Sequence, residues 1–453
     1  MTGFVNNCYQ FAFVSTTKEL LMENALKTVG ILAALAATTL AFPHPAAAKP
    51  FPAGIVNLMP IGHIYDHPWQ NVNVDGMRIR MGWEDIETQD GVYNWQLIDD
   101  CLALAATNGK FIGLSVVAGI KSPPWLMGGD TFTDGSTTLN VATLSSPTAN
   151  FVAADVGRVI DCEKFPPGTT IISRTSSVAT LSAPATATKS GHLTFSILAR
   201  HSGVPFRVLT APDEGVMPVP WNPVVLAKWR VFVAALGARY DGNPKLRYVP
   251  MGGFSQTGES YLATQQADVD HFNASAVAAG YTATVDFSAG MVAWQAVTKT
   301  IINTYMTAFP TTPPFITVAR PFPVDQGGVR AVNAIVAWGV DRYPGRFGIM
   351  NSQLHATSAP GYFATDAIYN NRQTQPTGAQ FLCSSGSADN VARLSNSPPW
   401  GSNPLLSPYH AINNSFTAAL NIGCRYVETY EADVTNSAYQ TLLATQGAAL
   451  KSR

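Results

Sequence analysis

Eight short runs of β-branched and apolar residues follow one another along the chain from Phe51 onward, and longer amphipathic stretches separate most of them. This alternation predicts repeated strand and helix units, because a parallel strand must be joined to the next one by a long crossover, usually a helix. The eight predicted strands cover residues 53–59, 75–83, 111–119, 246–254, 315–320, 346–354, 379–385 and 424–430.

The predicted helices carry apolar residues near a period of 3.6. The clearest ones cover residues 94–109, 223–240, 293–309, 328–343 and 407–423, and Gly109 and Gly423 stand where helices commonly end. Eight strands in this alternation favour an α/β fold of the closed (β/α)8 type, the TIM barrel, over an open doubly wound sheet. No GxGxxG or GxxxxGK[ST] run follows the first strand, which removes the main nucleotide-binding alternative.

The alternation stops between Asp130 and Arg200, where the chain is rich in Thr, Ser and Ala and has no helical stretch. We interpret this segment as a small all-β domain inserted in the loop after the third barrel strand. Its pattern "ADVG…PPGTTI…ATLS…ATAT" at residues 154–188 resembles a β module of phage and secreted bacterial surface proteins, which implies a spacer or adhesion role. The predicted organisation is a targeting segment (1–48), barrel (49–129), insert (130–200) and barrel (201–453).

The N-terminal segment has the features of a secretory signal. Lys27 precedes an apolar run at residues 29–42, and the small residues Ala46 to Ala48 follow it. We therefore expect a secreted protein, extracellular or periplasmic, without an integral membrane span once the signal is removed. A single N-terminal anchor is the less favoured alternative, because the run is short for a membrane span.

Composition narrows the range of partners. Charged residues make up 13% of the chain and the formal net charge is −1, which gives no support for a nucleic-acid or polyanion partner.

The cysteines lack a CxxC or Cys/His zinc spacing, so we predict buried thiols rather than metal ligands. No metal or organic cofactor is expected. Cys8 falls in the targeting segment, and the others are Cys101, Cys162, Cys383 and Cys424.

Two glutamates stand where a barrel of this type carries its chemistry, at the carboxyl ends of the strands. Glu259 follows the fourth strand in "VPMGGFSQTGESYL", and Glu428 lies in the eighth, in "RYVETYEADV". Glycoside hydrolysis needs two carboxyl groups across the scissile bond, one to protonate the leaving oxygen and one to attack or to activate water. The pair therefore predicts a carbohydrate substrate, with Glu431 and Asp433 as alternatives to Glu428.

The segment from Met77 to Leu126 resembles the opening of the retaining (β/α)8 glycoside hydrolases, the clan of β-galactosidases, cellulases and xylanases. The resemblance implies that Glu259 is the general acid/base and that Arg78, with Arg80 second, steadies the nucleophile. Two features depart from the clan: Gly258 precedes Glu259 in place of Asn, and the seventh strand offers no carboxylate, which moves the nucleophile to Glu428. The residues that carry the likeness are Trp83, Glu84, Gly91 to Trp95, Asp99 and Pro124-Trp125.

Further residues are predicted to bind the sugar. Tyr430 shares a strand face with Glu428. His355 follows the sixth strand, where it would orient a carboxylate or bind a hydroxyl group, although a structural role is the alternative. Tryptophans after strands offer flat faces for sugar rings, with packing in the core as the alternative reading for each. The tryptophans so predicted are Trp83 and Trp125, followed by Trp221, Trp294 and Trp400.

Two other functions compete with hydrolysis of glycosides. A catalytically inactive, secreted glycan-binding or surface protein on the same barrel is favoured by the missing Asn and the missing strand-seven carboxylate. The run "GFSQT" at residues 253–257 nearly matches the nucleophile elbow of α/β-hydrolases, but it lacks the last glycine and an immediate helix. For the hydrolase we predict a retaining mechanism, which requires the two facing carboxylates to lie roughly 5.5 Å apart, whereas a wider gap predicts inversion.

Overall fold

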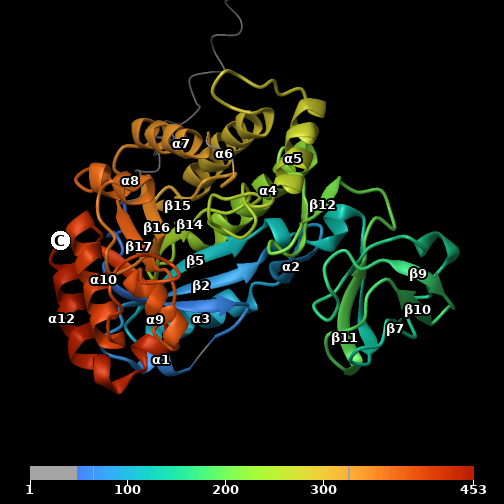
Figure 1. The fold of residues 1–453 in the computed structure, drawn as a ribbon, viewed down its shortest axis with the longest axis horizontal. Helices are drawn as coiled ribbons and strands as arrows, with labels where there is room; N and C mark the ends of the chain where they lie inside the picture. Colours follow the sequence, from blue (N-terminus) through green and yellow to red (C-terminus); the bar gives the residue numbers. More distant parts are fainter. Residues whose placement is uncertain (1–47, 65, 325–326) are drawn as a thin grey trace, which may run out of the picture. The chain divides into compact units, whose positions relative to one another are not determined.

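The computed structural model describes residues 48–64, 66–324 and 327–453. The predicted targeting segment, apart from Ala48, lies outside these residues, as does Cys8. Eight parallel strands close into a barrel in the order β1-β18-β17-β16-β15-β14-β5-β2 (Figure 1). The predicted (β/α)8 barrel is confirmed. Its strands are β1 (Gly54–Ile61), β2 (Gly76–Gly82), β5 (Phe111–Val117), β14 (Leu246–Pro250), β15 (Pro314–Thr317), β16 (Gly348–Leu354), β17 (Thr377–Phe381) and β18 (Tyr426–Tyr430).

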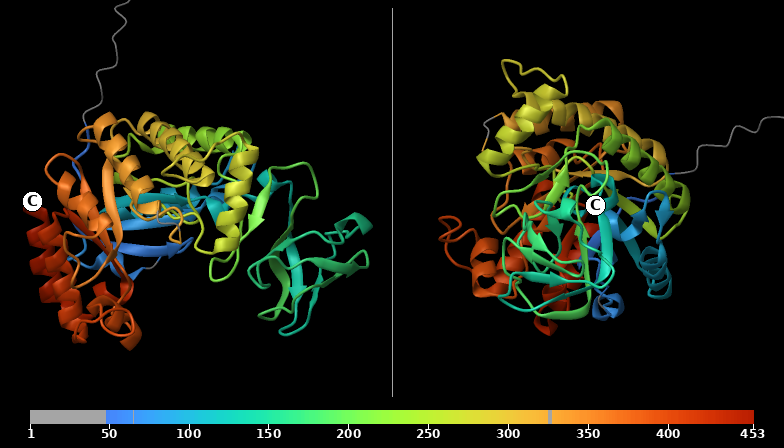
Figure 2. Two further views of the ribbon diagram at one scale, coloured as in Figure 1. Left: turned by 45° about the horizontal axis from the view of Figure 1, so that its top comes forward. Right: turned by 90° about the vertical axis from the view of Figure 1, so that its right-hand side faces the viewer.

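Helices lie around the outside of the strands (Figures 1 and 2). Side-chain caps fix several of their starts: Asn222 accepts a hydrogen bond from the Val224 amide at the start of α4, and Ser407 accepts one from His410 at the start of α10. Gly423 ends α10 with φ +98°, as predicted. The longer helices are α3 (Gln96–Thr107), α4 (Pro223–Tyr240), α5 (Gln266–Ala278), α6 (Ala289–Ala308), α7 (Gly328–Arg342), α8 (Phe363–Asn371), α9 (Ala388–Ser395), α10 (Pro408–Ile422) and α12 (Gln440–Lys451).

Short elements follow some of the strands. They are α1 (His67–Gln70), α2 (Trp83–Ile86), β3 (Glu87–Gln89), β4 (Val92–Tyr93), β12 (Phe206–Val208), β13 (Val216–Pro218) and α11 (Glu431–Val434). Among the residues that the structure describes, no helix is both long and apolar enough to cross a membrane. Cys101, Cys383 and Cys424 are buried free thiols, and Cys162 is partly buried.

Two tyrosines fill the inside of the barrel. Tyr248 and Tyr426 belong to a separate apolar cluster together with Val56, Phe315 and Met350, all five of them on barrel strands and almost fully buried. Glycines make room for the rings: a Cβ atom on Gly113 would lie 2.1 Å from the Tyr248 ring, and one on Gly378 would lie 2.1 Å from Tyr426. The barrel is therefore a packed core rather than a pore.

The inserted domain is a six-stranded antiparallel sheet in the order β8-β11-β6-β7-β10-β9. It has an apolar core of its own, built around Phe151, Phe195 and Leu144. The chain enters it after β5, the third barrel strand, so the predicted all-β insert is confirmed. Its strands are β6 (Asp130–Thr137), β7 (Thr143–Ser145), β8 (Ile160–Asp161), β9 (Ile171–Arg174), β10 (Val178–Leu181) and β11 (Lys189–Ile197).

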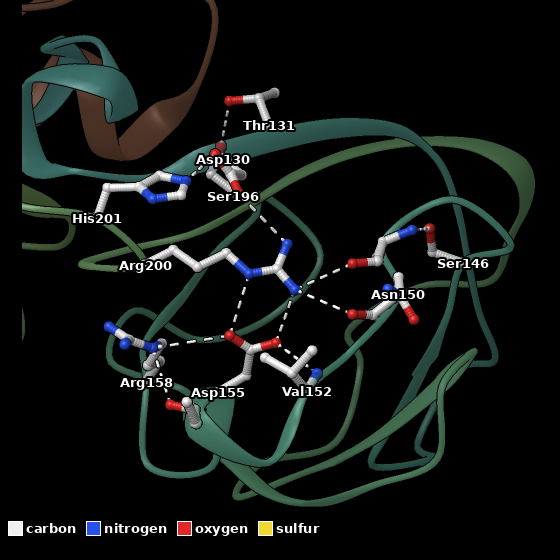
Figure 3. Close-up of polar contacts among 12 residues, drawn as sticks. Asp130, Thr131, Ser146, Asn150, Val152, Asp155, Arg158, Ser196, Arg200 and His201 are labelled. Carbon is white, nitrogen blue, oxygen red and sulfur yellow. Dashed lines mark hydrogen bonds and ion pairs between the residues drawn. The ribbon is translucent and has the colours of Figure 1, made fainter.

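Arg200 forms hydrogen bonds and ion pairs with several residues of the inserted domain (Figure 3). Its Nε and Nη2 atoms donate to the two oxygens of Asp155 at 3.1 and 2.8 Å, and its Nη1 atom lies 3.3 Å from Asp130. Nη2 also donates to the carbonyl groups of Ala149 and Asn150. The Asp155 side chain is 0% exposed, and its further partners are the Val152 amide at 2.9 Å and Arg158 at 3.7 Å.

We expect Arg200→Met to lower the free energy of unfolding of the insert by about 3 kcal/mol, because it leaves the buried Asp155 carboxylate with the Val152 amide and no close cation. The measurement is urea denaturation followed by a probe within residues 130–200. His201→Gln is the matched control, since His201 is 65% exposed and its bond to Asp130 is worth little at the surface. Equal losses in the two variants would contradict the assigned role of Arg200.

Candidate active site

A buried ion pair lies inside the barrel. Arg78 on β2 donates from Nη1 to Glu428 Oε2 on β18 at 2.7 Å, and these side chains are 6% and 0% exposed. The Tyr248 hydroxyl, from β14, donates to the other oxygen, Oε1, at 2.8 Å. Both oxygens of Glu428 therefore have a partner. Burial is the largest influence on Arg78 and opposes its charge, but Glu428 outweighs it and the pKa of Arg78 is raised.

Glu259 lies beyond the carboxyl end of β14 and is partly exposed. Burial raises the pKa of the Glu259 carboxyl, while the Ser352 hydroxyl and the charges of Arg78 and Arg80 offset part of that rise. A carboxyl group in this setting keeps its proton to a higher pH than an ordinary glutamate does. Glu259 therefore has the property that a general acid needs.

Arg80 and Tyr430 belong to the same neighbourhood. Arg80 is two residues further along β2 than Arg78, on the same face, and its Nε atom donates to the Met59 carbonyl at 2.8 Å. The Tyr430 hydroxyl donates to the Phe381 carbonyl at 3.2 Å. Burial raises the pKa of Tyr430, and the charges of Arg80 and Glu259 also act on it. Both side chains thus lie close to Glu259.

The structure brings together five of the residues singled out from the sequence, but it corrects the arrangement of the two carboxylates. We expected both to face the open end of the barrel. Glu259 is partly exposed, whereas Glu428 is 0% exposed because Arg78 and Tyr248 cover its two oxygens. The five residues are Glu259, Glu428, Arg78, Arg80 and Tyr430.

Trp83 is a core residue and not a surface for a sugar ring. It is 0% exposed, its Nε1 atom donates to Glu87 at 2.6 Å, and its ring lies edge-on to Trp229 with centroids 4.9 Å apart. Trp125 is partly buried in the same aromatic cluster and donates to the Glu87 carbonyl at 2.9 Å. Trp229 lies on helix α4 and Trp83 on α2, so this contact packs the two helices against each other. Trp221 and Trp294 are buried as well, while Trp400 is 53% exposed.

The remaining predicted residues have local structural partners. The Nδ1 atom of His355 lies 3.1 Å from the Thr357 hydroxyl, burial lowers the pKa of His355, and no described carboxylate contacts it. Glu431 lies 3.8 Å from His67 near the surface. Asp433 is fully buried and accepts hydrogen bonds from Ser385 and Thr429. None of these three joins the Glu259 neighbourhood through a described contact.

Three residues of the site were not identified from the sequence: Tyr248, Gln380 and Ser352. Gln380 lies on β17, the seventh barrel strand, with Oε1 3.4 Å from Arg78 Nη1 and Nε2 3.3 Å from the Tyr430 hydroxyl. It therefore occupies the strand from which the resemblance would draw a nucleophile, with an amide in place of a carboxylate. The available signal in the sequence was strand alternation, which places Gln380 on the same face of the strand as Gly378.

Comparison with known proteins finds similar solved structures at low sequence identity. No family model matches the chain, and no curated protein matches it. A β-galactosidase from the psychrophilic Marinomonas ef1 is similar over 87% of this chain, with 9% identity and a TM-score of 0.42, and the match spans 59% of that structure. A psychrophilic glycoside hydrolase family 10 endo-β-1,4-xylanase is matched over 85% of this chain and 88% of its own, with 8% identity and a TM-score of 0.41.

The catalytic domain of the major endoglucanase from Xanthomonas campestris pv. campestris is matched over 87% of this chain and 94% of its own, with 9% identity and a TM-score of 0.40. A pyruvate kinase from Cryptosporidium parvum is matched over 89% of this chain and 70% of its own, with 9% identity and a TM-score of 0.32. The chain is a (β/α)8 barrel with an inserted β domain and a buried polar site. Among the described residues, no group of three or more His, Cys, Asp and Glu side chains is placed to hold a metal ion.

Proposed function

We propose that the protein is a secreted glycoside hydrolase that cleaves O-glycosidic bonds in a poly- or oligosaccharide, with Glu259 as its general acid. The observation that carries this proposal is the Glu259 carboxyl, which lies at the carboxyl end of a barrel strand and has its pKa raised by burial. Protonation of the departing oxygen is the step for which such a carboxyl group is suited, because a sugar alkoxide is a poor leaving group.

Glu428 is the second carboxylate of this proposal. In the first step a bond forms between Glu428 Oε1 and the anomeric carbon, the glycosidic bond breaks, and the proton of Glu259 goes to the leaving oxygen. Water then cleaves the glycosyl ester and returns a proton to Glu259. Since Oε1 accepts from Tyr248, this bond must be exchanged for the sugar carbon when substrate binds. Retention of the anomeric configuration follows.

A second function, glycan binding without hydrolysis, is favoured by one specific observation. Glu428 is 0% exposed, so it lacks surface for contact with a sugar carbon. The side-chain amide of Gln380, next to Arg78, also favours this second function, because an amide can neither attack the anomeric carbon nor activate water. In this case the barrel mouth would hold a glycan that it does not cleave.

A substrate screen separates these functions. The purified secreted protein is assayed on aryl glycosides and on plant and algal polysaccharides for release of reducing ends, and on the same polysaccharides for binding by affinity gel electrophoresis. Hydrolysis with retention in the first product, read by NMR, supports the two-carboxylate mechanism, and inversion would rule out Glu428 as nucleophile. Binding without release of reducing ends would favour the second function. Mass determination of the secreted protein tests removal of the signal near Ala48.

The pH dependence of hydrolysis provides a further prediction. A general acid works while it is protonated, so kcat/KM should persist above the pH range of an ordinary glutamate and fall as pH rises through the raised pKa of Glu259. The charge of Arg80 lowers the pKa of Glu259, so Arg80→Gln should move this upper limb to higher pH. An upper limb that stays in place or moves downward in Arg80→Gln would contradict the assignment.

A further inference from the structure

Arg80 is a cation without an anionic partner among the described residues. Its Nε atom donates to the Met59 carbonyl, and no described carboxylate forms an ion pair with it. Its two terminal nitrogens, Nη1 and Nη2, make no hydrogen bond to any described residue, and neither is sealed from solvent. Arg80 thus presents two free N–H bearing nitrogens on the inward face of β2, beyond the paired Arg78.

The charges around Arg80 do not balance. The charge of Arg78 is compensated by Glu428 at 2.7 Å. Glu259 is the remaining carboxyl close to Arg80, and burial favours its neutral form. Burial also lowers the pKa of Arg80, and the charge of Arg78 lowers it further. An anion at the free nitrogens would relieve both effects, because an opposite charge offsets desolvation of a cation.

Arg320 is a second arginine without a partner among the described residues. It lies beyond the carboxyl end of β15, is partly buried and forms no hydrogen bond or ion pair with them. It lines a groove of about 980 Å³ that also contains Asp341 and Asp366. Because these two carboxylates oppose the binding of an anion, Arg80 and not Arg320 is the cation that an anion would pair with.

We infer that the barrel mouth binds an acidic glycan, with the carboxylate of one uronic acid unit on Arg80. The guanidinium fork matches a carboxylate in geometry and binds it through two parallel hydrogen bonds. The net charge of −1 gives no general attraction for polyanions, so recognition rests on this side chain. This inference rests on the proposed function, whose substrate class it names.

Binding to matched oligosaccharides tests the inference. The full chain carrying Glu259→Gln, which prevents turnover, is titrated calorimetrically with a uronate oligosaccharide, with its carboxyl-reduced counterpart and with a sulfated galactan oligosaccharide. We expect the uronate to bind most tightly. Adding Arg80→Gln should weaken uronate binding by about 10- to 100-fold, the range for a hydrogen bond to a charged group, and leave the reduced sugar unaffected. Arg174→Gln, an exposed arginine of the insert, is the matched control.

Each other outcome counts against the inference. Equal affinity for the uronate and the reduced sugar would overturn it, and so would an equal loss for both ligands in Arg80→Gln, which would indicate a structural role. Tighter binding of the sulfated ligand would overturn the carboxylate assignment. Should Arg80→Gln fail to fold, the ratio of affinities for the uronate and for its carboxyl-reduced counterpart, measured in Glu259→Gln alone, still decides the inference. In the parent chain, uronate binding without hydrolysis would refute the proposed hydrolase alone, while hydrolysis of neutral glycans only would refute this inference alone.

Discussion

Replacement of Arg78 by methionine should lower the free energy of unfolding by about 3–5 kcal/mol, the largest effect on stability that we expect from a single change in the barrel. Glu428 is 0% exposed, and Arg78 is its only cationic partner among the described residues. Without the arginine, the hydroxyl of Tyr248 is left to stabilise a buried carboxylate. Removing such a charge from water costs more free energy than one hydrogen bond to a neutral group contributes.

A double variant shows whether this loss comes from the unpaired charge of Glu428. Arg78→Met/Glu428→Gln, which retains neither charge, should recover part of the stability that Arg78→Met loses. Urea denaturation of the parent, the single variant and the double variant measures both the loss and the recovery. A loss below about 1 kcal/mol in the single variant at pH 8 would contradict the burial of the pair.

The barrel was predictable because its determinants are local. Each strand lies between a packed interior and a layer of helices, so it reads as a short, nearly continuous apolar run, and the eight runs stand out from the amphipathic helices between them. The insert was predictable for the opposite reason: its Thr- and Ser-rich sequence breaks the helical period over residues 130–200. Both features belong to single segments and need no knowledge of distant contacts.

The site was predictable only in part, because the burial of a side chain inside the barrel depends on residues that are distant in the sequence. The position of Glu259 after β14 follows from chain order, and the inward direction of Glu428 follows from strand alternation. The covering of Glu428 depends on Tyr248, which comes from a different strand and fits only because Gly113 leaves room for its ring. Trp83 likewise is a core residue because α4 supplies Trp229.

Replacement of Glu259 by glutamine should reduce kcat/KM for a glycoside with a poorly acidic leaving group by about 10²- to 10⁴-fold, the usual contribution of general acid catalysis. An amide cannot donate a proton to the departing oxygen. Glycosides whose leaving group is already a good one, such as a dinitrophenolate, need little protonation, so their loss in the first step should be much smaller. Steady-state kinetics on both kinds of substrate measure this contrast.

The contrast separates catalysis from mere folding or binding. A misfolded site would lose activity on both kinds of substrate equally, whereas a missing proton donor spares the good leaving group. The upper limb of the pH profile should also disappear with the Glu259 carboxyl, since no group would then lose the catalytic proton. Glu163→Gln, a glutamate of the insert whose side chain is 70% exposed, is the matched control and should retain parent activity. An equal loss on both substrates, or an upper limb that survives in Glu259→Gln, would show that another group donates the proton.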